Sequence, residues 1–229
     1  MNKSILITGC SSGLGLALTN FYLNKDFVVY GISRSKPNIE NKNFHFKEYD
    51  LSNIHGIKND LSSFIYDIVN LNTVYLNAGM LGEIKEITNL SIDEIKEVLD
   101  LNVFANKEIL DILSKTKVEN IIALSSGASQ NGSKGWGAYS LSKSSLNMLI
   151  NIYAKEMLNT KLLALAPGVI ETPMTDYIRY EVNDDIFTSA KILKNGDIQK
   201  PEIAARRLHN VVINIDKFKS GSFIDVRNI

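Results

Sequence analysis

Short, almost wholly apolar segments rich in β-branched residues alternate along the chain with longer stretches in which apolar residues recur at helical spacing. Segments that are apolar throughout, rather than at every second position, are typical of parallel strands covered on both faces of a sheet. They predict seven strands, over residues 4–8, 27–33, 44–50, 73–77, 120–125, 162–166 and 222–226.

The helical patterns fall near residues 13–24, 53–70, 91–115, 137–158 and 201–214. Regular alternation of strand and helix predicts an α/β fold with a doubly wound parallel sheet and helices on both faces. No repeat or linker divides residues 1–229, so we expect a single domain. Residues 172–200 form one long irregular connection after the sixth strand, where ligands bind in such sheets. We interpret this segment as a substrate lid, with plain packing on the core as the alternative.

The composition excludes several classes of function. Twenty-five Lys and Arg residues balance twenty-five Asp and Glu residues, so no bulk charge favours nucleic acid or an anionic membrane. No apolar run approaches the ~20 residues that a membrane span needs. The three histidines are far apart and Cys10 is the only cysteine, which excludes an internal disulfide and argues against a bound metal. We therefore expect a soluble, cytoplasmic protein.

A glycine-rich turn, Thr8-Gly-Cys-Ser-Ser-Gly-Leu-Gly15, follows the first predicted strand and opens the first predicted helix, as a dinucleotide-binding motif requires. Gly9 allows a tight turn, Gly13 lets the backbone approach a pyrophosphate, and Gly15 lets helix and strand pack closely. The turn predicts cofactor contacts from Gly9, Ser11, Ser12, Gly13, Leu14 and Gly15. We interpret Cys10 as a small packing residue, with redox sensing as the alternative.

The end of the second strand determines which coenzyme is expected. NAD sites place an acidic residue there to hold the ribose 2′-OH, whereas this strand ends in Ser33 and Arg34. The Arg34 guanidinium can pair with a 2′-phosphate, and Ser11, Ser12 and Ser33 can add hydroxyl contacts. We therefore expect NADP (as NADPH), with NAD less favoured. The alternative is that Arg34 is a solvated loop residue.

Tyr139 and Lys143 lie four residues apart in a predicted helix, so the ammonium can sit beside the phenol on one helix face. With nine tyrosines in the chain, chance alone supplies roughly one such pair. What distinguishes this pair is its place in an ordered series of motifs. After the glycine turn come Asn77-Ala78-Gly79, Asn102, Ser126, the Tyr139/Lys143 pair, and Pro167-Gly168-Val169 followed by Thr172.

This order and spacing resemble the short-chain dehydrogenase/reductase family over nearly the whole chain. The resemblance implies a Rossmann fold and hydride transfer between a nicotinamide coenzyme and a carbonyl group. It implies a catalytic tetrad of Asn102, Ser126, Tyr139 and Lys143. In that tetrad Tyr139 is the general acid, Lys143 lowers the pKa of the phenol and holds the nicotinamide ribose, and Asn102 holds a proton-relaying water. Further cofactor contacts are implied for Asp50, Leu51, Asn77, Ala78, Gly79, Pro167, Gly168, Val169 and Thr172, besides Tyr139 and Lys143.

The sequence therefore predicts an NADP-dependent carbonyl reductase for a compact, mostly apolar ketone or diketone. Residues 193–205 and 220–229 resemble the sepiapterin reductase and benzil reductase branch of the family. One alternative is a 3-oxoacyl-carrier-protein reductase, for which Arg179, Arg206 and Arg207 are the candidate docking residues. The other is a dinucleotide-binding sensor without turnover.

We also expect a homodimer or homotetramer. By the resemblance, subunits pair through the two helices that carry Asn102 and the Tyr139/Lys143 pair. The second of these helices repeats apolar residues at helical spacing, more than one internal contact needs. These residues are Leu146, Leu149, Ile150, Tyr153 and Met157. The alternative is that all of them face the sheet.

Overall fold

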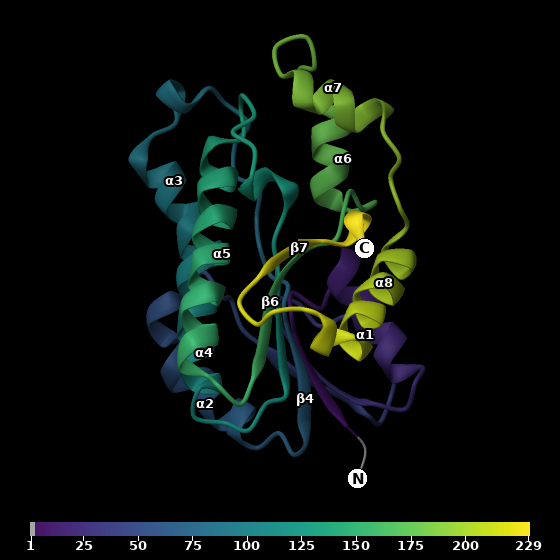
Figure 1. The fold of residues 1–229 in the computed structure, drawn as a ribbon. Helices are drawn as coiled ribbons and strands as arrows, with labels where there is room; N and C mark the ends of the chain where they lie inside the picture. The colour runs from purple at the N-terminus through teal and green to yellow at the C-terminus, as the bar shows by residue number, and fades with distance from the viewer. Residues whose placement is uncertain (1–2) are drawn as a thin grey trace.

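The apolar segments of the sequence form one sheet. The computed structural model describes residues 3–229, and its seven strands are all parallel, in the order β3-β2-β1-β4-β5-β6-β7 (Figure 1). The chain winds from β1 outward to β3, returns to β4 and winds outward again to β7. The predicted doubly wound, seven-stranded parallel sheet is confirmed. The strands are β1 (Ser4–Thr8), β2 (Val28–Ser33), β3 (Phe44–Glu48), β4 (Leu71–Leu76), β5 (Asn120–Leu124), β6 (Lys161–Ala166) and β7 (Phe223–Asp225).

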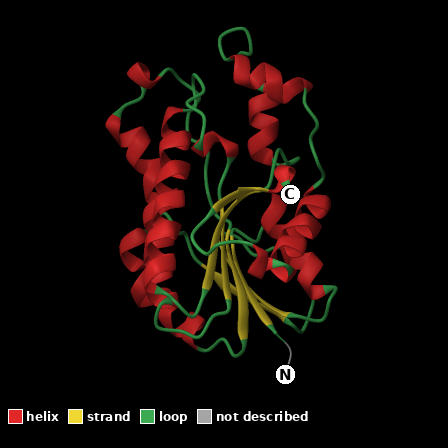
Figure 2. Cartoon of the chain, viewed as in Figure 1, coloured by secondary structure: helices red, strands yellow, loops and turns green. Residues whose placement is uncertain are grey.

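Helices cover both faces of the sheet (Figures 1 and 2). Apolar residues of α2 (Ile57–Tyr66), α4 (Ala105–Leu113) and α5 (Gly137–Glu156) pack on one face. Those of α1 (Gly13–Leu23) and α8 (Pro201–Ile213) pack on the other. The remaining helices are α3 (Ile92–Leu99), α6 (Pro173–Tyr180) and α7 (Thr188–Asn195), and the last two rise beyond the sheet (Figure 1).

Burial on both faces explains why the strands are apolar throughout. Ile5, Leu6 and Ile7 of β1 are all 0% exposed. Leu6 packs in the core beneath α2, α4 and α5, while Ile5 and Ile7 pack in the core beneath α1 and α8. Full burial of such a side chain stabilises the fold by about 1.5–3 kcal/mol. Because side chains of β1 are buried on both faces of the sheet, packing against both helical layers stabilises this strand.

One predicted helix contains a wider turn than expected. The pattern over residues 91–115 forms α3, a π-helical turn at Asp100–Phe104, and α4. Ser91 begins α3 with a capping box: its hydroxyl accepts from the Glu94 backbone N–H, and the Glu94 carboxylate accepts from the Ser91 backbone N–H. Single π-turns occur frequently at functional sites, and this one contains Asn102.

The apolar stripe expected to mediate subunit contact faces the core instead. Leu146 and Ile150 are 0% exposed, and Tyr153 is buried beside them. Leu149 and Met157 pack against the same core. The physical reason is that α5 covers the sheet over β5 and β6, so it needs this whole face for internal packing. The interpretation of these residues as a surplus is wrong.

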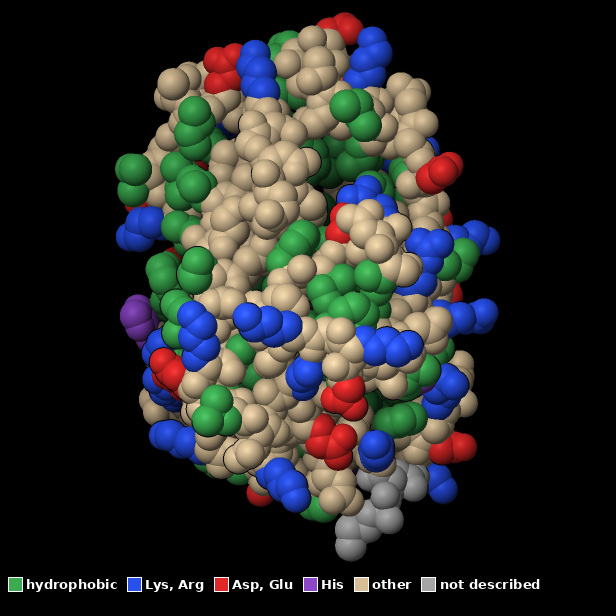
Figure 3. Space-filling view, in the orientation of Figure 1, with side chains coloured by type: hydrophobic (Ala, Val, Ile, Leu, Met, Phe, Trp, Pro, Cys, Tyr) green, Lys and Arg blue, Asp and Glu red, His purple; other side chains and the backbone are tan. Residues whose placement is uncertain are grey.

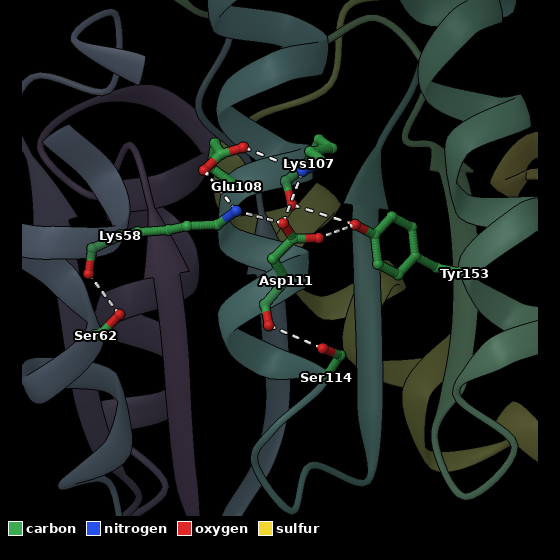
Figure 4. Close-up of polar contacts among 7 residues, drawn as sticks. All are labelled: Lys58, Ser62, Lys107, Glu108, Asp111, Ser114 and Tyr153. Carbon is green, nitrogen blue, oxygen red and sulfur yellow. Dashed lines mark hydrogen bonds and ion pairs between the residues drawn. The ribbon is translucent and has the colours of Figure 1, made fainter. Parts of the chain in front are cut away.

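Charged side chains join the helices of this layer. Lys58 Nζ lies 2.6 Å from Asp111 Oδ2, and Lys107 Nζ lies 2.7 Å from the same oxygen. The Tyr153 hydroxyl donates to the other carboxylate oxygen of Asp111. Figure 4 shows these residues of α2, α4 and α5 converging on one carboxylate. The network therefore fixes three helices relative to one another.

None of the helices formed by residues 3–229 is long and apolar enough to cross a membrane. Over the same residues, His, Cys, Asp and Glu side chains nowhere gather in groups of three or more that could hold a metal ion. Cys10 is buried and forms no disulfide.

Candidate active site

The motifs of the sequence meet at one edge of the sheet. Because all strands are parallel, their carboxyl ends lie together, and each motif follows one of them. The glycine turn follows β1, Asn77 follows β4, Ser126 lies just beyond β5, and Gly168 lies just beyond β6. Figure 3 shows the surface hollowed there, between the ends of α5 and α6, with hydrophobic side chains in the wall.

The glycine turn has a backbone that only glycine suits. Gly9 and Gly13 have φ angles of 69° and 51°, in the left-handed region. A Cβ on Gly15 would lie 2.0 Å from the carbonyl oxygen of Gly9, so α1 and the turn approach as closely as two backbones can. At Gly9 and Gly13 the turn therefore leaves its backbone free of side chains, as a pyrophosphate requires.

The N-terminus of α1 has unpartnered donors at this turn. Ser12 is its N-cap residue, yet the Ser12 side chain forms no capping hydrogen bond, and the first turn contains no acidic residue. The first N–H groups of a helix have no internal acceptors, and the helix dipole makes this end positive. The arrangement fits the phosphates of a dinucleotide.

Asn77 fastens the glycine turn to β4. Its Nδ2 donates to the carbonyl oxygens of Thr8 and Gly9, at 3.0 and 3.1 Å. The backbone N–H groups of Asn77 and Ala78 both donate to Thr8 Oγ1, at 2.9 and 3.0 Å. The side chain of Asn77 thus positions the cofactor turn, and its predicted contact with the cofactor stays a prediction.

The segment after β6 closes over the glycine turn. Gly168 has a φ angle of 85°, and Thr172 caps α6 by accepting a hydrogen bond from the Thr175 N–H at 3.3 Å. The methyl group of Thr172 lies 3.1 Å from the position that a Cβ on Gly13 would take. The two predicted cofactor segments therefore lie in contact, and Pro167 and Val169, on either side of Gly168, are half-buried.

The end of β2 differs in part from expectation. Ser33 is buried, and its hydroxyl donates to the Ser35 carbonyl oxygen at 2.8 Å, while its contact with the coenzyme stays a prediction. Arg34 is exposed, as a phosphate contact requires. Cys10 Sγ lies 3.4 Å from Ser33 Oγ and fills the space beside Gly31, where burial raises the pKa of the thiol. These contacts support the packing interpretation of Cys10.

Asp50 and Leu51 follow β3 at the same edge. Asp50 is exposed and accepts hydrogen bonds from the Ser52 N–H and hydroxyl, at 3.0 and 2.8 Å. The Ser52 backbone bond, with a smaller contribution from the charge of Arg34, holds the pKa of Asp50 below its usual value. Leu51 is 4% exposed, packed in the core. The acid near Arg34 thus comes from the third strand rather than the second.

Ser126 and Tyr139 come together beyond β5. Ser126 begins a short 3-10 turn, Gly127–Ser129, and its hydroxyl accepts from the Ala128 N–H at 3.1 Å. Tyr139 lies in the first turn of α5 and is hydrogen-bonded to Ser126. Burial raises the pKa of the Tyr139 phenol to about 12, and the bond with Ser126 opposes part of that rise. Two hydroxyl groups therefore converge on one point.

Lys143 lies one turn further along α5 and is 5% exposed. Its Nζ donates to the Leu124 carbonyl oxygen at 2.7 Å and lies 5.6 Å from the centroid of the Tyr139 ring. Burial lowers the pKa of Lys143 to about 8. Burial is the main influence on the Tyr139 phenol, whose pKa is raised, and the lowering by Lys143 that the resemblance implies stays a prediction.

Asn102 is 0% exposed and joins two segments of the site. Its Oδ1 accepts from the Met80 N–H at 2.8 Å, and its Nδ2 donates to the Met80 carbonyl oxygen and to Ser142 Oγ, at 2.8 and 2.9 Å. Both N–H donors of the amide are thereby used. The side chain positions the loop after β4 against α5, next to Lys143, and the expected water relay stays a prediction.

Aromatic and aliphatic side chains surround Tyr139. The Trp136 ring centroid lies 6.0 Å from that of Tyr139, and the Trp136 indole N–H donates to Ser189 Oγ at 2.6 Å. This bond ties α7 to the start of α5. The surrounding apolar cluster consists of Leu81, Ile84, Trp136, Tyr139, Met174, Tyr177, Ile178, Val182, Phe187, Ala190 and Leu193.

Two large apolar residues of the predicted lid, residues 172–200, face solvent. Tyr180 is 73% exposed and Ile186 is 50% exposed, whereas Ile178 is 3% exposed. Residues 178 and 180 point to opposite sides because two positions correspond to more than half a helical turn. Arg179 lies over the Tyr180 ring, 5.2 Å from its centroid.

Comparison with known proteins agrees with this geometry. A model of the short chain dehydrogenase family matches residues 3–183. The chain belongs to the short chain dehydrogenase family. The benzil reductase ((S)-benzoin forming) of Bacillus cereus is 28% identical, over 98% of this chain and 99% of its own. The sepiapterin reductase of Bos taurus is 35% identical, over 40% of this chain and 35% of its own.

A crystal structure of a short chain dehydrogenase/reductase from Saccharomyces cerevisiae has the same fold, with a TM-score of 0.84 at 24% identity. The alignment covers 98% of this chain and 96% of that one. Together these relatives confirm the resemblance to the family and to its sepiapterin reductase and benzil reductase branch. The protein is therefore an oxidoreductase of this family.

Sequence reasoning missed two groups at the site of this short chain dehydrogenase. One is the Trp136–Ser189 bond, which joins residues too far apart in the chain for spacing to indicate. The other is Arg227, which lies between the ends of β5 and β6, against Gly127 and Gly168. Its only signal in the sequence is a basic residue directly after the last predicted strand.

Proposed function

We propose that this chain is an NADP-dependent carbonyl reductase that reduces a ketone to an alcohol. The observation that carries the proposal is the convergence of the Ser126 and Tyr139 hydroxyls beside the buried ammonium of Lys143. During hydride reduction, negative charge develops on the carbonyl oxygen, so donors aimed at that oxygen stabilise the transition state. A sensor without turnover has no need of this arrangement.

NADPH would be held by the glycine turn, the N-terminus of α1 and Thr172, and when bound it supplies the hydride. Ser126 and Tyr139 orient the carbonyl oxygen, and Tyr139 gives its proton to the oxygen as charge develops. A pKa of about 12 keeps the phenol protonated at neutral pH and ready to donate. The phenolate left behind is stabilised by the Lys143 ammonium, 5.6 Å from the ring centroid.

The choice of NADP rests on Arg34. The guanidinium is exposed where the ribose 2′-phosphate would lie, and the end of β2 has no acid to repel that phosphate. NADPH is expected to bind at least tenfold tighter than NADH, about 1.4 kcal/mol, and Arg34→Asp should reverse the preference. Fluorescence titration measures both affinities, with Lys42→Asp, before β3, as the control of equal charge change. Equal affinity of the wild-type chain for both coenzymes would contradict this choice.

The substrate is a compact, mostly apolar ketone or diketone, reduced beneath α6 and α7. The apolar cluster around Tyr139 supports this, because binding pockets are mostly apolar with a few oriented polar groups. The full-length benzil reductase relative supports an aromatic diketone in particular. We assign residues 172–200 as the substrate lid, fastened by the Trp136–Ser189 hydrogen bond.

Subunits would associate through the outer surfaces of α4 and α5. Phe104 is 46% exposed there, and Leu141, Met148 and Ile152 of α5 are 50, 61 and 44% exposed. The last three recur at helical spacing, on the side opposite the core. Light scattering should show a homodimer or homotetramer, and Met148→Glu should weaken the association of the subunits. A particle of 25.5 kDa at micromolar concentration would contradict this proposal.

The general acid is tested by Tyr139→Phe, which removes the hydroxyl and keeps the ring. Turnover of small ketones should fall by ~100-fold or more, while NADPH affinity stays nearly intact. Tyr180→Phe, at an exposed position, is the matched control. Near-normal turnover in Tyr139→Phe would disprove the role. A clear preference for acyl-carrier-protein substrates over small aromatic diketones would favour the fatty-acid alternative.

A further inference from the structure

Arg227 reaches across the carboxyl edge of the sheet from β6 to β5. Its Cδ lies 3.4 Å from the position that a Cβ on Gly168 would take, and its Nη2 lies 3.5 Å from the corresponding position on Gly127. Gly127 directly follows Ser126 and has no side chain to separate it from the guanidinium. The guanidinium therefore stands next to the residue that holds one of the two converging hydroxyls.

Asp225 holds this guanidinium in a two-point contact. Arg227 Nε donates to Asp225 Oδ1 at 2.9 Å, and Nη2 donates to Oδ2. The Asp225 side chain is 12% exposed, whereas that of Arg227 is 55% exposed. A guanidinium has five N–H donors, and this contact uses two of them. Among the described residues the other three have no acceptor, so they can donate to a ligand.

We propose that Arg227 is a specificity-determining residue, which donates to the second oxygen of a vicinal dicarbonyl substrate. This inference rests on the carbonyl reductase function proposed above. Ser126 and Tyr139 hold the oxygen that is reduced, and the second oxygen, on the adjacent carbon, lies toward Gly127 and Arg227. One hydride and one proton convert the first carbonyl to an alcohol, and the second is unchanged. The product is a 2-hydroxyketone.

The pairing with Asp225 determines whether Arg227 favours a ketone oxygen or a carboxylate oxygen of the substrate. Its bond from Arg227 holds the pKa of the Asp225 carboxyl below its usual value, so the pair is ionised and nearly neutral overall at pH 7. A neutralised guanidinium attracts a further carboxylate weakly, while its remaining N–H groups still donate to a neutral acceptor. The site therefore favours the ketone oxygen of a diketone over the carboxylate of a 2-oxo acid.

The test compares 1-phenyl-1,2-propanedione with propiophenone, which has the same skeleton but lacks the second carbonyl. NADPH consumption gives kcat and KM for both ketones with the wild type, Arg227→Leu and Arg227→Lys. Arg227→Leu should lose about tenfold in kcat/KM on the dione, mainly through KM, and less than about twofold on propiophenone. Arg227→Lys keeps the positive charge but lacks the forked N–H donors of a guanidinium. Its kcat/KM on the dione should therefore lie between the values for the wild type and Arg227→Leu. Lys217→Leu, exposed after α8, also removes one positive charge, and as the control it should keep both values.

Asp225→Asn tests the effect of charge. It leaves the guanidinium positive, so kcat/KM for phenylglyoxylate should rise about tenfold relative to that for the dione. Equal losses on both ketones in Arg227→Leu and Arg227→Lys would show a role in folding alone, and unchanged dione kinetics would show no substrate contact. Either result overturns the inference and leaves the reductase function standing. A wild-type chain that reduces neither ketone would overturn the reductase function itself, and the inference with it.

Discussion

Replacing Lys143 with methionine is expected to stabilise the protein at neutral pH while it removes catalysis. The Lys143 ammonium is 5% exposed and donates to the Leu124 carbonyl, and no carboxylate pairs with it among the described residues. Burial lowers its pKa from 10.5 to about 8. At 1.36 kcal/mol per pKa unit, the folded state disfavours the charged side chain by about 3 kcal/mol.

The sign of the pH dependence follows from proton binding. Between pH 8 and pH 10.5 the unfolded chain binds a proton at Lys143 that the native chain does not, so the free energy of unfolding rises with pH. Below pH 8 both states are protonated, and the full cost of the buried ammonium remains. Above about pH 10, the raised pKa of buried tyrosines such as Tyr139 acts in the opposite direction. From about pH 9 the raised pKa of the buried Cys10 thiol also acts in the opposite direction, so the contribution of Lys143 is taken from the difference between the wild type and Lys143→Met.

Urea unfolding at pH 7, 8, 9 and 10, at one protein concentration, measures this contribution. At pH 7, Lys143→Met should gain about 2 kcal/mol, because about 3 kcal/mol is recovered and about 1 kcal/mol is lost with the bond to Leu124. The gain should disappear by pH 10. Lys96→Met, at an exposed position of α3, is the control and should show neither effect. A less stable Lys143→Met at pH 7, together with a difference from the wild type that stays constant from pH 8 to 10, would refute the reasoning.

Three further outcomes are expected. Gly15→Ala places a Cβ 2.0 Å from the Gly9 carbonyl oxygen, so calorimetry should show a loss of ~1–3 kcal/mol and titration a weaker NADPH affinity; unchanged values would contradict the close contact. Ser189→Ala removes the acceptor of the Trp136 indole N–H, so hydrogen exchange in α6 and α7 should quicken and KM for ketones should rise; unchanged exchange would show that the bond does not hold this segment. Burial alone would raise the pKa of Asp111, but hydrogen bonds from Lys107 and Lys58 hold this pKa well below the usual value. Asp111→Asn should therefore cost ~1 kcal/mol at pH 7, measured by urea unfolding, and the difference from wild type should shrink progressively as the pH falls below about 4, towards the lowered pKa of the folded state; a difference that stays constant over that range would show that the charge is not the cause.

The sheet and the position of its site could be predicted because both follow from simple periodicities. Strands that are apolar throughout must be covered on both faces, and parallel strands place their carboxyl ends together, so motifs that follow strands must meet. The packing direction of helix residues was less predictable. The stripe that contains Leu146 and Ile150 could have faced either a partner or the sheet, since hydrophobicity alone does not say which.

Within the site, residue identities were easier to predict than side-chain directions. Asn77 and Ser33 occupy expected positions, but their polar atoms bond to neighbouring backbone, because a buried amide or hydroxyl must find a partner there. Arg227 and Ser189 belong to segments that spacing within a motif does not reach. Their contacts depend on how the last strand and α7 fold back over the sheet, which local sequence patterns do not encode.

The central place of β1 has a consequence for how the protein is made. β1 precedes the other strands of this sheet along the chain, yet one of its two partners is β4, with Ser4 opposite Leu71. Until β4 is synthesised, β1 has an open edge, because β2 pairs with its other edge and β3 pairs with β2. Such non-local parallel pairing folds slowly and exposes apolar edges to aggregation. The nascent chain therefore passes through a stage in which β1, which is buried in the native sheet, has an unpaired apolar edge. This edge is what chaperones would have to shield from aggregation.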